Sequence, residues 1–231
     1  MKQSEFIEEL EKLDIYPTEE QLSQLENYYE LIVEYNKKMN LTAITDKEDI
    51  YLKHFYDSLT ISKIIDLNKQ NSLCDMGSGA GFPGLVLKIF YPHLSVTLVD
   101  SLEKRVKFLN TVIKELNLHF IEAVHDRMEE FSLKNVEKYD IVTARAVTTL
   151  SALLEMSSPC IKIDKYFIAM KGNFDEEYKM ALKELKMKED SFIEFDLPKE
   201  AGHRTLIKIE KKEKTPDKYP RKFSEIKKQN L

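Results

Sequence analysis

The chain has 231 residues, of which 42% are hydrophobic and 32% charged, a composition typical of a folded globular protein. A net charge of -5 argues against a generic nucleic-acid-binding protein, two cysteines are too few for a disulfide framework, and the five histidines lack zinc-site spacing. Since no apolar run is long enough to span a bilayer and the N-terminus lacks an apolar signal core, we expect a cytoplasmic protein without a structural metal or a membrane partner.

Residues 1–68 are predicted to form a helical N-terminal cap. After an acidic first helix, Thr18 and Gln21 have the spacing of a capping box, and apolar residues then recur at helical period through a second helix. The pattern breaks at residues 40–42, and a further helical stretch is expected from about 46–65.

Residues 69–210 are predicted to form a Rossmann-like α/β domain. Helical stretches, clearest at 102–116, 149–156 and 173–187, alternate with β-rich runs. The expected strands are 73–76, 94–99, 120–124, 140–143, 166–170, 192–195 and 205–209. This alternation indicates a mostly parallel sheet with helices on both faces. The last two strands are joined without a helix, which predicts a hairpin and one antiparallel strand that closes the sheet.

A glycine-rich loop follows the first expected strand. Residues 77–84 contain four glycines, and Pro83 suits the first turn of the next helix, whose free N–H groups face any ligand in the loop. The last three glycines also fit a dinucleotide fingerprint, with Asp100 as the ribose-binding acid. Asp75, however, would repel a pyrophosphate and attract the cationic methionine end of S-adenosylmethionine. The loop therefore favours S-adenosylmethionine.

The residues at the end of the fourth expected strand help to distinguish which kind of atom would accept the methyl group. Residues 143–146 (Thr-Ala-Arg-Ala) lack the Asp/Asn-Pro-Pro-aromatic turn used for exocyclic amines. Cys160 comes too late to be the nucleophile of pyrimidine C5 methylation and is expected to be buried packing. A ring nitrogen such as guanine N7 needs no general base once it is aligned, whereas ribose O-methylation by a lysine stays open as an alternative.

Two basic regions raise the question of a phosphate partner. Lys104, Arg105 and Lys107 open a helix, where the helix dipole disfavours cations, so they fit either a phosphate contact or a solvated face. Residues 211–231 carry eight Lys and Arg residues and three acidic ones, whereas residues 1–30 carry nine acidic residues and two lysines. The basic tail fits a solvated, partly disordered end as well as a phosphate-binding arm.

Several segments, in chain order, resemble the bacterial rRNA small subunit methyltransferase G family, also called GidB. They are His54–Leu59, Asp75–Gly84, Leu98–Leu109, Thr143–Ala146, Lys171-Gly172 with Gly202–Arg204, and the basic end Tyr219–Lys222. The resemblance runs from about residue 20 to the end. It implies an S-adenosylmethionine-dependent enzyme of the Rossmann-like methyltransferase fold. It further implies methylation of guanine N7 in 16S rRNA of the small ribosomal subunit and release of S-adenosylhomocysteine. We expect the chain to act as a monomer.

The resemblance and the glycine loop together predict the site. The expected cofactor-binding residues are Asp75, Gly77, Gly79, Phe82, Asp100, Ser101, Leu102, Met128, Glu129 and Arg145. The expected catalytic residues are Arg145, His54 and Asp57, although His54 and Asp57 equally fit a cap packed on the sheet, and Arg145 a surface ion pair. The expected RNA-backbone contacts are Lys104, Arg105, Lys171, Arg204, Arg221 and Lys222.

Three other functions compete with this interpretation. One is a methyltransferase of the same fold that acts on another RNA atom, a small molecule or a protein. The second is a nicotinamide oxidoreductase that uses the dinucleotide-like glycine spacing. The third is a ribosome assembly factor that keeps the loop without turnover.

Overall fold

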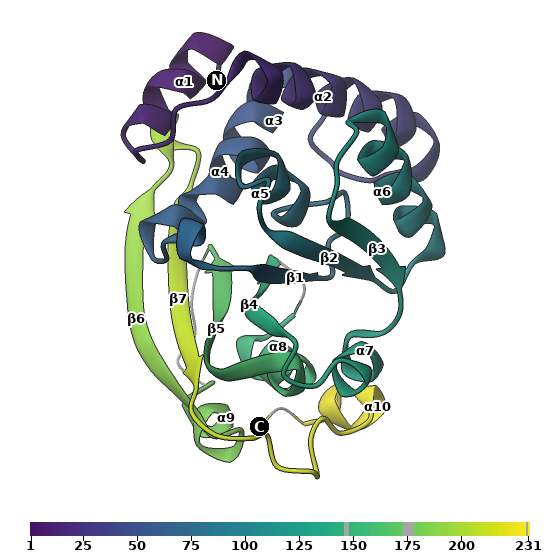
Figure 1. The fold of residues 1–231 in the computed structure, drawn as a ribbon, viewed down its shortest axis with the longest axis vertical. Helices are drawn as coiled ribbons and strands as arrows, with labels where there is room; N and C mark the ends of the chain where they lie inside the picture. The colour runs from purple at the N-terminus through teal and green to yellow at the C-terminus, as the bar shows by residue number, and fades with distance from the viewer. Residues whose placement is uncertain (146–147, 173–177, 230) are drawn as a thin grey trace.

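The computed structural model describes residues 1–145, 148–172, 178–229 and 231. Within this part of the chain one sheet has the strand order β3-β2-β1-β4-β5-β7-β6 (Figure 1). Its strands are β1 (Ser72–Met76), β2 (Ser95–Asp100), β3 (Ile121–His125), β4 (Tyr139–Arg145), β5 (Ile161–Lys171), β6 (Met187–Asp196) and β7 (His203–Lys211).

Helices cover both faces of this sheet (Figure 1). The helices before the sheet are α1 (Gln3–Glu11), α2 (Glu19–Met39), α3 (Lys47–Ile50) and α4 (Asp57–Leu59). The helices between and after the strands are α5 (Gly84–Phe90), α6 (Glu103–Glu115), α7 (Met128–Lys134), α8 (Leu150–Ser157), α9 (Lys179–Glu184) and α10 (Phe223–Ile226).

The parallel and antiparallel pairings agree with the predicted topology. The five strands from β1 to β5 pair in parallel, and β7 runs antiparallel to both β5 and β6. The hairpin is confirmed, and the antiparallel strand lies between β5 and the edge strand β6. Because β7 is antiparallel, its first residues meet the carboxyl end of β5, where Lys171 pairs with Thr205. Arg204 thereby lies near the carboxyl ends of the parallel strands, where α/β folds bind ligands.

Two apolar cores form because strand side chains alternate between the faces. In β1, Leu73 belongs to the core that includes buried residues of α1 to α6, whereas Cys74 belongs to the core that includes buried residues of α7 to α10. Cys160 is fully buried in this second core, as predicted. The N-terminal helices share their core with α5 and α6, so they are fixed to one side of the sheet (Figure 1).

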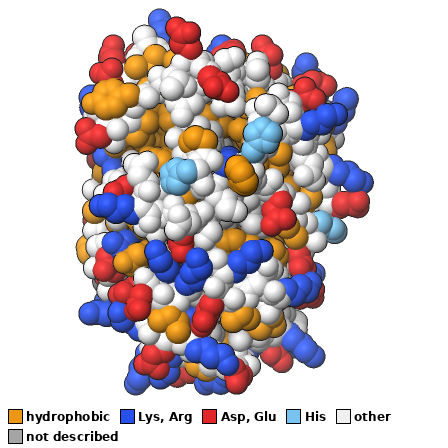
Figure 2. Space-filling model, viewed as in Figure 1, with side chains coloured by type: hydrophobic (Ala, Val, Ile, Leu, Met, Phe, Trp, Pro, Cys, Tyr) orange, Lys and Arg blue, Asp and Glu red, His pale blue; other side chains and the backbone are white. Residues whose placement is uncertain are grey.

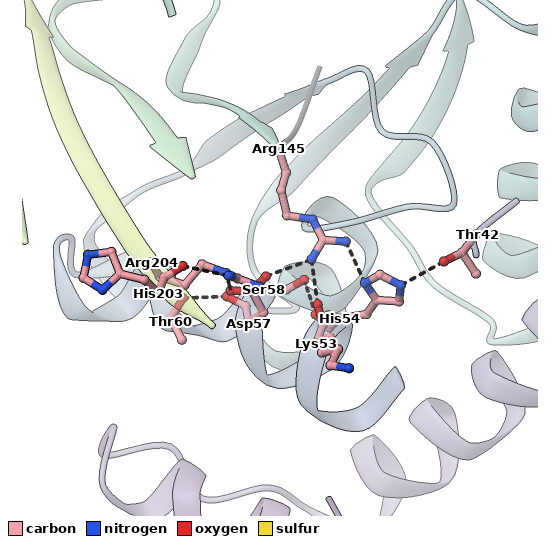
Figure 3. A network of polar contacts seen from close by, with 9 residues as sticks. All are labelled: Thr42, Lys53, His54, Asp57, Ser58, Thr60, Arg145, His203 and Arg204. Carbon is pink, nitrogen blue, oxygen red and sulfur yellow. Dashed lines mark hydrogen bonds and ion pairs between the residues drawn. The ribbon is translucent and has the colours of Figure 1, made fainter. Parts of the chain in front are cut away.

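The N-terminal region follows its local sequence signals at α2. Thr18 and Gln21 exchange the two hydrogen bonds of the capping box, at 3.2 and 2.9 Å, and Asn40 ends the helix with a φ of 49°. The helical stretch expected over residues 46–65 is confirmed, and it divides into α3, a π-helical turn at Tyr51–Tyr56, α4 and a 3-10 turn at Thr60–Lys63. His54 in the π turn and Asp57 at the start of α4 both point toward Arg145 at the end of β4 (Figure 3).

A second expected helix is shorter than predicted. Of the stretch 173–187, residues 173–177 lie outside the described part of the chain, as does Ala146 of the fourth-strand motif. Helix α9 ends at Glu184, and Lys186 has a φ of 59°, which turns the chain directly into β6 at Met187. Among the described residues, no helix is both long and apolar enough to cross a membrane, and no cluster of potential metal ligands occurs.

Candidate functional site

A cavity of about 880 Å³ lies at the carboxyl ends of β1, β2 and β4. The glycine loop forms one wall, and the residues after β2 and β3 form another. Of the predicted cofactor-binding residues, those that line it are Gly77, Gly79, Phe82, Asp100, Ser101, Leu102, Met128, Glu129 and Arg145. Loop residues distant in the sequence thus converge on the position where open α/β sheets bind their ligands.

The glycines of the loop meet different requirements. Gly77 and Gly79 have φ values of 76° and 60°, a region that disfavours side chains. A Cβ on Gly79 would have only the Gly77 carbonyl within 4 Å, at 3.9 Å, so this part of the loop is open to a ligand. A Cβ on Gly84 would lie 2.3 Å from Leu98 Cδ2 and 2.8 Å from Asp75 Oδ2. Gly84 is therefore required by packing.

Asp75 does not line the cavity, which corrects the prediction that it contacts the cofactor directly. Its side chain is fully buried beneath the loop, where Oδ2 accepts the Gly84 N–H at 2.9 Å. Burial raises the pKa of Asp75 to about 7. Its Oδ1 accepts no hydrogen bond from the described residues. In this conformation Asp75 holds the loop against the first turn of α5.

Asp100 presents a buried carboxylate to the cavity. The residue is 2% exposed, Oδ2 accepts the Gly79 N–H and Oδ1 accepts the Leu102 N–H, both at 2.9 Å. Arg105 approaches Oδ2 at 3.4 Å. Backbone donors thus fix both oxygens at the end of β2, and their remaining lone pairs suit a ligand with two adjacent hydroxyl groups.

Arg145 is the centre of a polar network at the other end of the cavity (Figure 3). Its Nη1 donates to the Lys53 carbonyl and to Asp57 Oδ2, both at 3.1 Å, and its Nη2 donates to His54 Nδ1 at 2.9 Å. Arg204 Nε donates to the other carboxylate oxygen, Asp57 Oδ1, at 2.8 Å. Two guanidinium groups therefore share one buried carboxylate, and the network carries a net positive charge.

His54 is held as a neutral acceptor. Since Nδ1 accepts from Arg145, the proton lies on Nε2, which donates to Thr42 Oγ1 at 3.0 Å. Its ring stacks on Phe82 with centroids 4.5 Å apart. Burial, reinforced by the Arg145 charge, lowers the pKa of His54 from 6.5 to about 3. The structure thus makes His54 and Asp57 partners that orient Arg145, and gives His54 no free basic nitrogen.

The lowered pKa predicts an acid-dependent loss of stability. Unfolding frees the imidazole to bind a proton that the folded site rejects, so the free energy of unfolding should fall below pH 6.5 by about 1.4 kcal/mol per unit. We expect His54→Gln, which keeps an acceptor but does not titrate, to lack this contribution. Urea unfolding of both chains between pH 7 and pH 5 measures it. A stability difference that is independent of pH would contradict the assigned protonation state.

A second cavity of about 360 Å³ adjoins the network and shares His54 and Arg145 with the first. Its charged lining residues are Lys53, Asp57, Arg145, Lys171 and Arg204, four cations against one carboxylate. Two of the predicted RNA contacts, Lys171 and Arg204, are thus brought together by β5 and β7. This cavity suits an anionic or hydrogen-bond-accepting group.

The other predicted RNA contacts are dispersed. Lys104 Nζ lies 3.4 Å from the Met39 carbonyl, and Arg105 lines the large cavity beside Asp100. Arg221 pairs with fully buried Glu155 on α8, with Nη2 2.6 Å from Oε2. The guanidinium of Arg221 is therefore engaged within the protein, and RNA contact by it and by neighbouring Lys222 stays a prediction.

Sequence reasoning missed the contribution of the C-terminal segment. Phe223, Ile226 and Lys227 line the large cavity next to Met128 and Glu129. An apolar pair spaced three residues apart within a basic tail was the available signal, because that spacing indicates one face of a helix.

Three comparisons with known proteins each find similar proteins. The family model described as "GidB: rRNA small subunit methyltransferase G" matches residues 21–207. A Staphylococcus carnosus protein named ribosomal RNA small subunit methyltransferase G is 49% identical over 226 residues, 94% of this chain and 93% of that protein. A Bacillus pumilus protein of the same name is 47% identical over 228 residues, 96% of this chain and 95% of that protein.

Solved structures share the fold at low identity. A SAM-dependent methyltransferase from Aquifex aeolicus superposes with a TM-score of 0.55 at 16% identity, over 72% of this chain and 94% of that one. TYW2 from M. jannaschii in complex with AdoMet gives a TM-score of 0.52 at 15% identity, over 62% and 70%. The predicted Rossmann-like fold is confirmed.

Proposed function

The chain belongs to the rRNA small subunit methyltransferase G family, and on this basis we propose that it transfers the methyl group of S-adenosylmethionine to N7 of a guanine in 16S rRNA. The observation that carries the proposal is the pair of adjoining cavities that share His54 and Arg145. A methyl donor in the large cavity and a nucleotide at the cationic one would meet at this boundary. Since one chain builds both cavities, we propose that it acts as a monomer.

The residues present fit S-adenosylmethionine. The open space over Gly79 admits a ligand close to the backbone, and the Asp100 oxygens suit the ribose diol. Glu129 and the apolar side chain of Met128 line the part of the cavity that suits an adenine. In its ionised form, Asp75, whose Oδ1 is unpartnered just beneath the loop, adds negative potential for the cationic methionine end.

The bound cofactor supplies an electrophilic methyl group, and the chain supplies alignment. Arg145 is fixed in direction by its three acceptors, so its guanidinium can orient a purine or an adjoining phosphate at the cavity boundary. The His54–Phe82 stack makes a flat wall beside it. These groups position the acceptor and exclude water, which is the main requirement for a nucleophile with a free lone pair.

The protonation state of His54 does not suit the activation of a hydroxyl acceptor. A ribose hydroxyl must lose its proton, and His54, the imidazole at the boundary, has its Nδ1 occupied by Arg145 and a pKa of about 3. Guanine N7 carries no proton and needs no base. A guanine must be unstacked or flipped out to reach this position, so the substrate is expected to expose it in a loop.

The two signs of charge are mixed over the face seen in Figure 2, so RNA affinity is expected to depend on local contacts. Lys171→Gln removes a cation at the small cavity and should lower the slope of log affinity against log salt by about one. Lys162→Gln, at the opposite end of β5, is the control and should leave the slope unchanged. Filter binding to 16S rRNA fragments between 50 and about 200 mM salt measures both. Equal slopes for wild type and Lys171→Gln would remove Lys171 from the RNA interface.

The proposed reaction is tested by incubating the chain with methyl-labelled S-adenosylmethionine and small subunits that lack the modification. After nuclease digestion, the label should co-migrate with 7-methylguanosine. Label in another nucleoside would replace the N7 assignment with another RNA atom. No transfer despite cofactor binding would favour an assembly factor or another substrate class.

A further inference from the structure

The C-terminal segment 219–229 combines two unusual features. Its Arg221 forms an ion pair with buried Glu155, and its short helix α10 contributes Phe223 and Ile226, with Lys227 directly after it, to the wall of the large cavity. The match to the family model ends at residue 207, before this segment begins. Neither its charge nor its position is needed to complete the sheet.

The buried ion pair fixes the segment in place. Glu155 is fully buried on α8, and its Oε1 accepts the Arg221 backbone N–H at 2.9 Å and Nε at 2.8 Å, while Oε2 accepts Nη2 at 2.6 Å. An unpaired carboxylate at this depth would be strongly unfavourable, so the core of the protein is completed only when the segment is docked. Tyr219 and Ile226, 6% and 1% exposed, add apolar contacts to the same core.

Docking places an aromatic face at the cavity. Phe223 is 41% exposed although it lines the cavity, and the Arg127 guanidinium lies 5.4 Å from its ring centroid. An aromatic ring left partly open, with a cation beside it, is a platform on which a planar, electron-rich base can stack. Among the described residues, the only cation placed against this ring is Arg127, the residue directly before Met128 and Glu129, which line the same cavity.

We propose that the C-terminal segment forms the outer wall of the adenosyl-binding end of the cavity, with Phe223 in direct contact with the adenine. The inference rests on the proposed function in so far as it takes the ligand to be S-adenosylmethionine. The Arg221–Glu155 pair holds the wall in position, and Ile226 anchors the helix that carries it. The tail is thus part of the cofactor site, in addition to any contact with RNA.

The test is calorimetric titration of the full-length chain with S-adenosylhomocysteine and, separately, with adenosine. Phe223→Ala should weaken both by roughly tenfold, as expected when a stacked aromatic side chain is removed. Phe192→Ala is the matched control, since Phe192 is also an exposed phenylalanine, 56% exposed on β6 and outside the cavity lining. It should bind both ligands as the wild type does.

The anchor is tested with the double variant Glu155→Gln/Arg221→Gln, which removes both charges together and leaves neither buried alone. It should lose affinity for both ligands by a similar factor while its unfolding stays cooperative. In the reverse direction, S-adenosylhomocysteine should slow tryptic cleavage after Lys222 and Lys227 in the wild type.

Each outcome decides between the two proposals. If Phe223→Ala binds both ligands as tightly as the wild type, the tail is not part of the site, whereas the proposed function stands. If the wild type binds adenosine but not S-adenosylhomocysteine, and Phe223→Ala loses adenosine binding, the wall stands and the methyl-transfer proposal falls. Binding of neither ligand by the wild type overturns both.

Discussion

Replacing Arg145 with lysine is expected to lower kcat/KM for methyl transfer to RNA by roughly 100-fold, the size of effect seen when one fixed electrostatic donor is lost. The guanidinium reaches three acceptors in different directions, the Lys53 carbonyl, Asp57 and His54. An ammonium group is compact and lacks the planar fork, so it cannot serve all three and still face the cavity. Steady-state kinetics with labelled cofactor and small subunits measures the loss.

The control for Arg145→Lys is a measurement of whether the variant still folds. The substitution leaves an acceptor of the network unpaired, which should cost about 1–3 kcal/mol of the free energy of unfolding without unfolding the protein. Cooperative urea unfolding, together with a measurable affinity for S-adenosylhomocysteine, would show that the lost rate reflects the site. Activity within a few-fold of wild type would contradict the role of Arg145 at the boundary of the two cavities.

Replacing Asp100 with asparagine should weaken S-adenosylmethionine binding by roughly 100-fold, equivalent to about 3 kcal/mol. The carboxylate accepts the Gly79 and Leu102 N–H groups with separate oxygens, and asparagine offers one oxygen and one NH2 group. One backbone donor then faces another donor, and the ribose loses a charged acceptor. Calorimetric titration of the variant measures the change.

Asp126→Asn is the matched control for Asp100. Asp126 also follows a strand, β3, but it pairs with Lys134 and is not part of the cavity lining. Its variant should bind the cofactor as the wild type does. Equal affinities for wild type and Asp100→Asn would contradict the proposed contact between the ribose and this carboxylate. They would also contradict the orientation proposed for the cofactor.

The sequence predicts the fold, and it predicts most of the residues that line the large cavity, because both depend on local signals. Strand-helix alternation, a glycine run and Asp100 at a strand end are readable at short range, and the topology then brings them together. The capping box of Thr18 and Gln21 is equally local and is confirmed.

The errors arise where long-range packing decides. Asp75 is placed correctly at the end of β1, but its burial against Gly84, which no local pattern reveals, keeps its side chain from the cavity. Within the helical stretch expected over residues 46–65, no local pattern reveals the π turn, or that His54 in it and Asp57 directly after it bind Arg145 from 88 or more residues away. The ion pair of Arg221 with buried Glu155 is likewise a long-range contact that no local pattern indicates.

The central claim is that the large cavity holds S-adenosylmethionine with its methyl group toward Arg145 and the smaller cationic cavity. A crystal structure of the chain with S-adenosylhomocysteine tests it most directly. We predict density along the glycine loop, with the ribose hydroxyls on Asp100, the adenine beside Met128 and Phe223, and the sulfur facing the His54–Arg145 boundary. Density for the ligand in another place, or with the sulfur turned away from Arg145, would contradict the account.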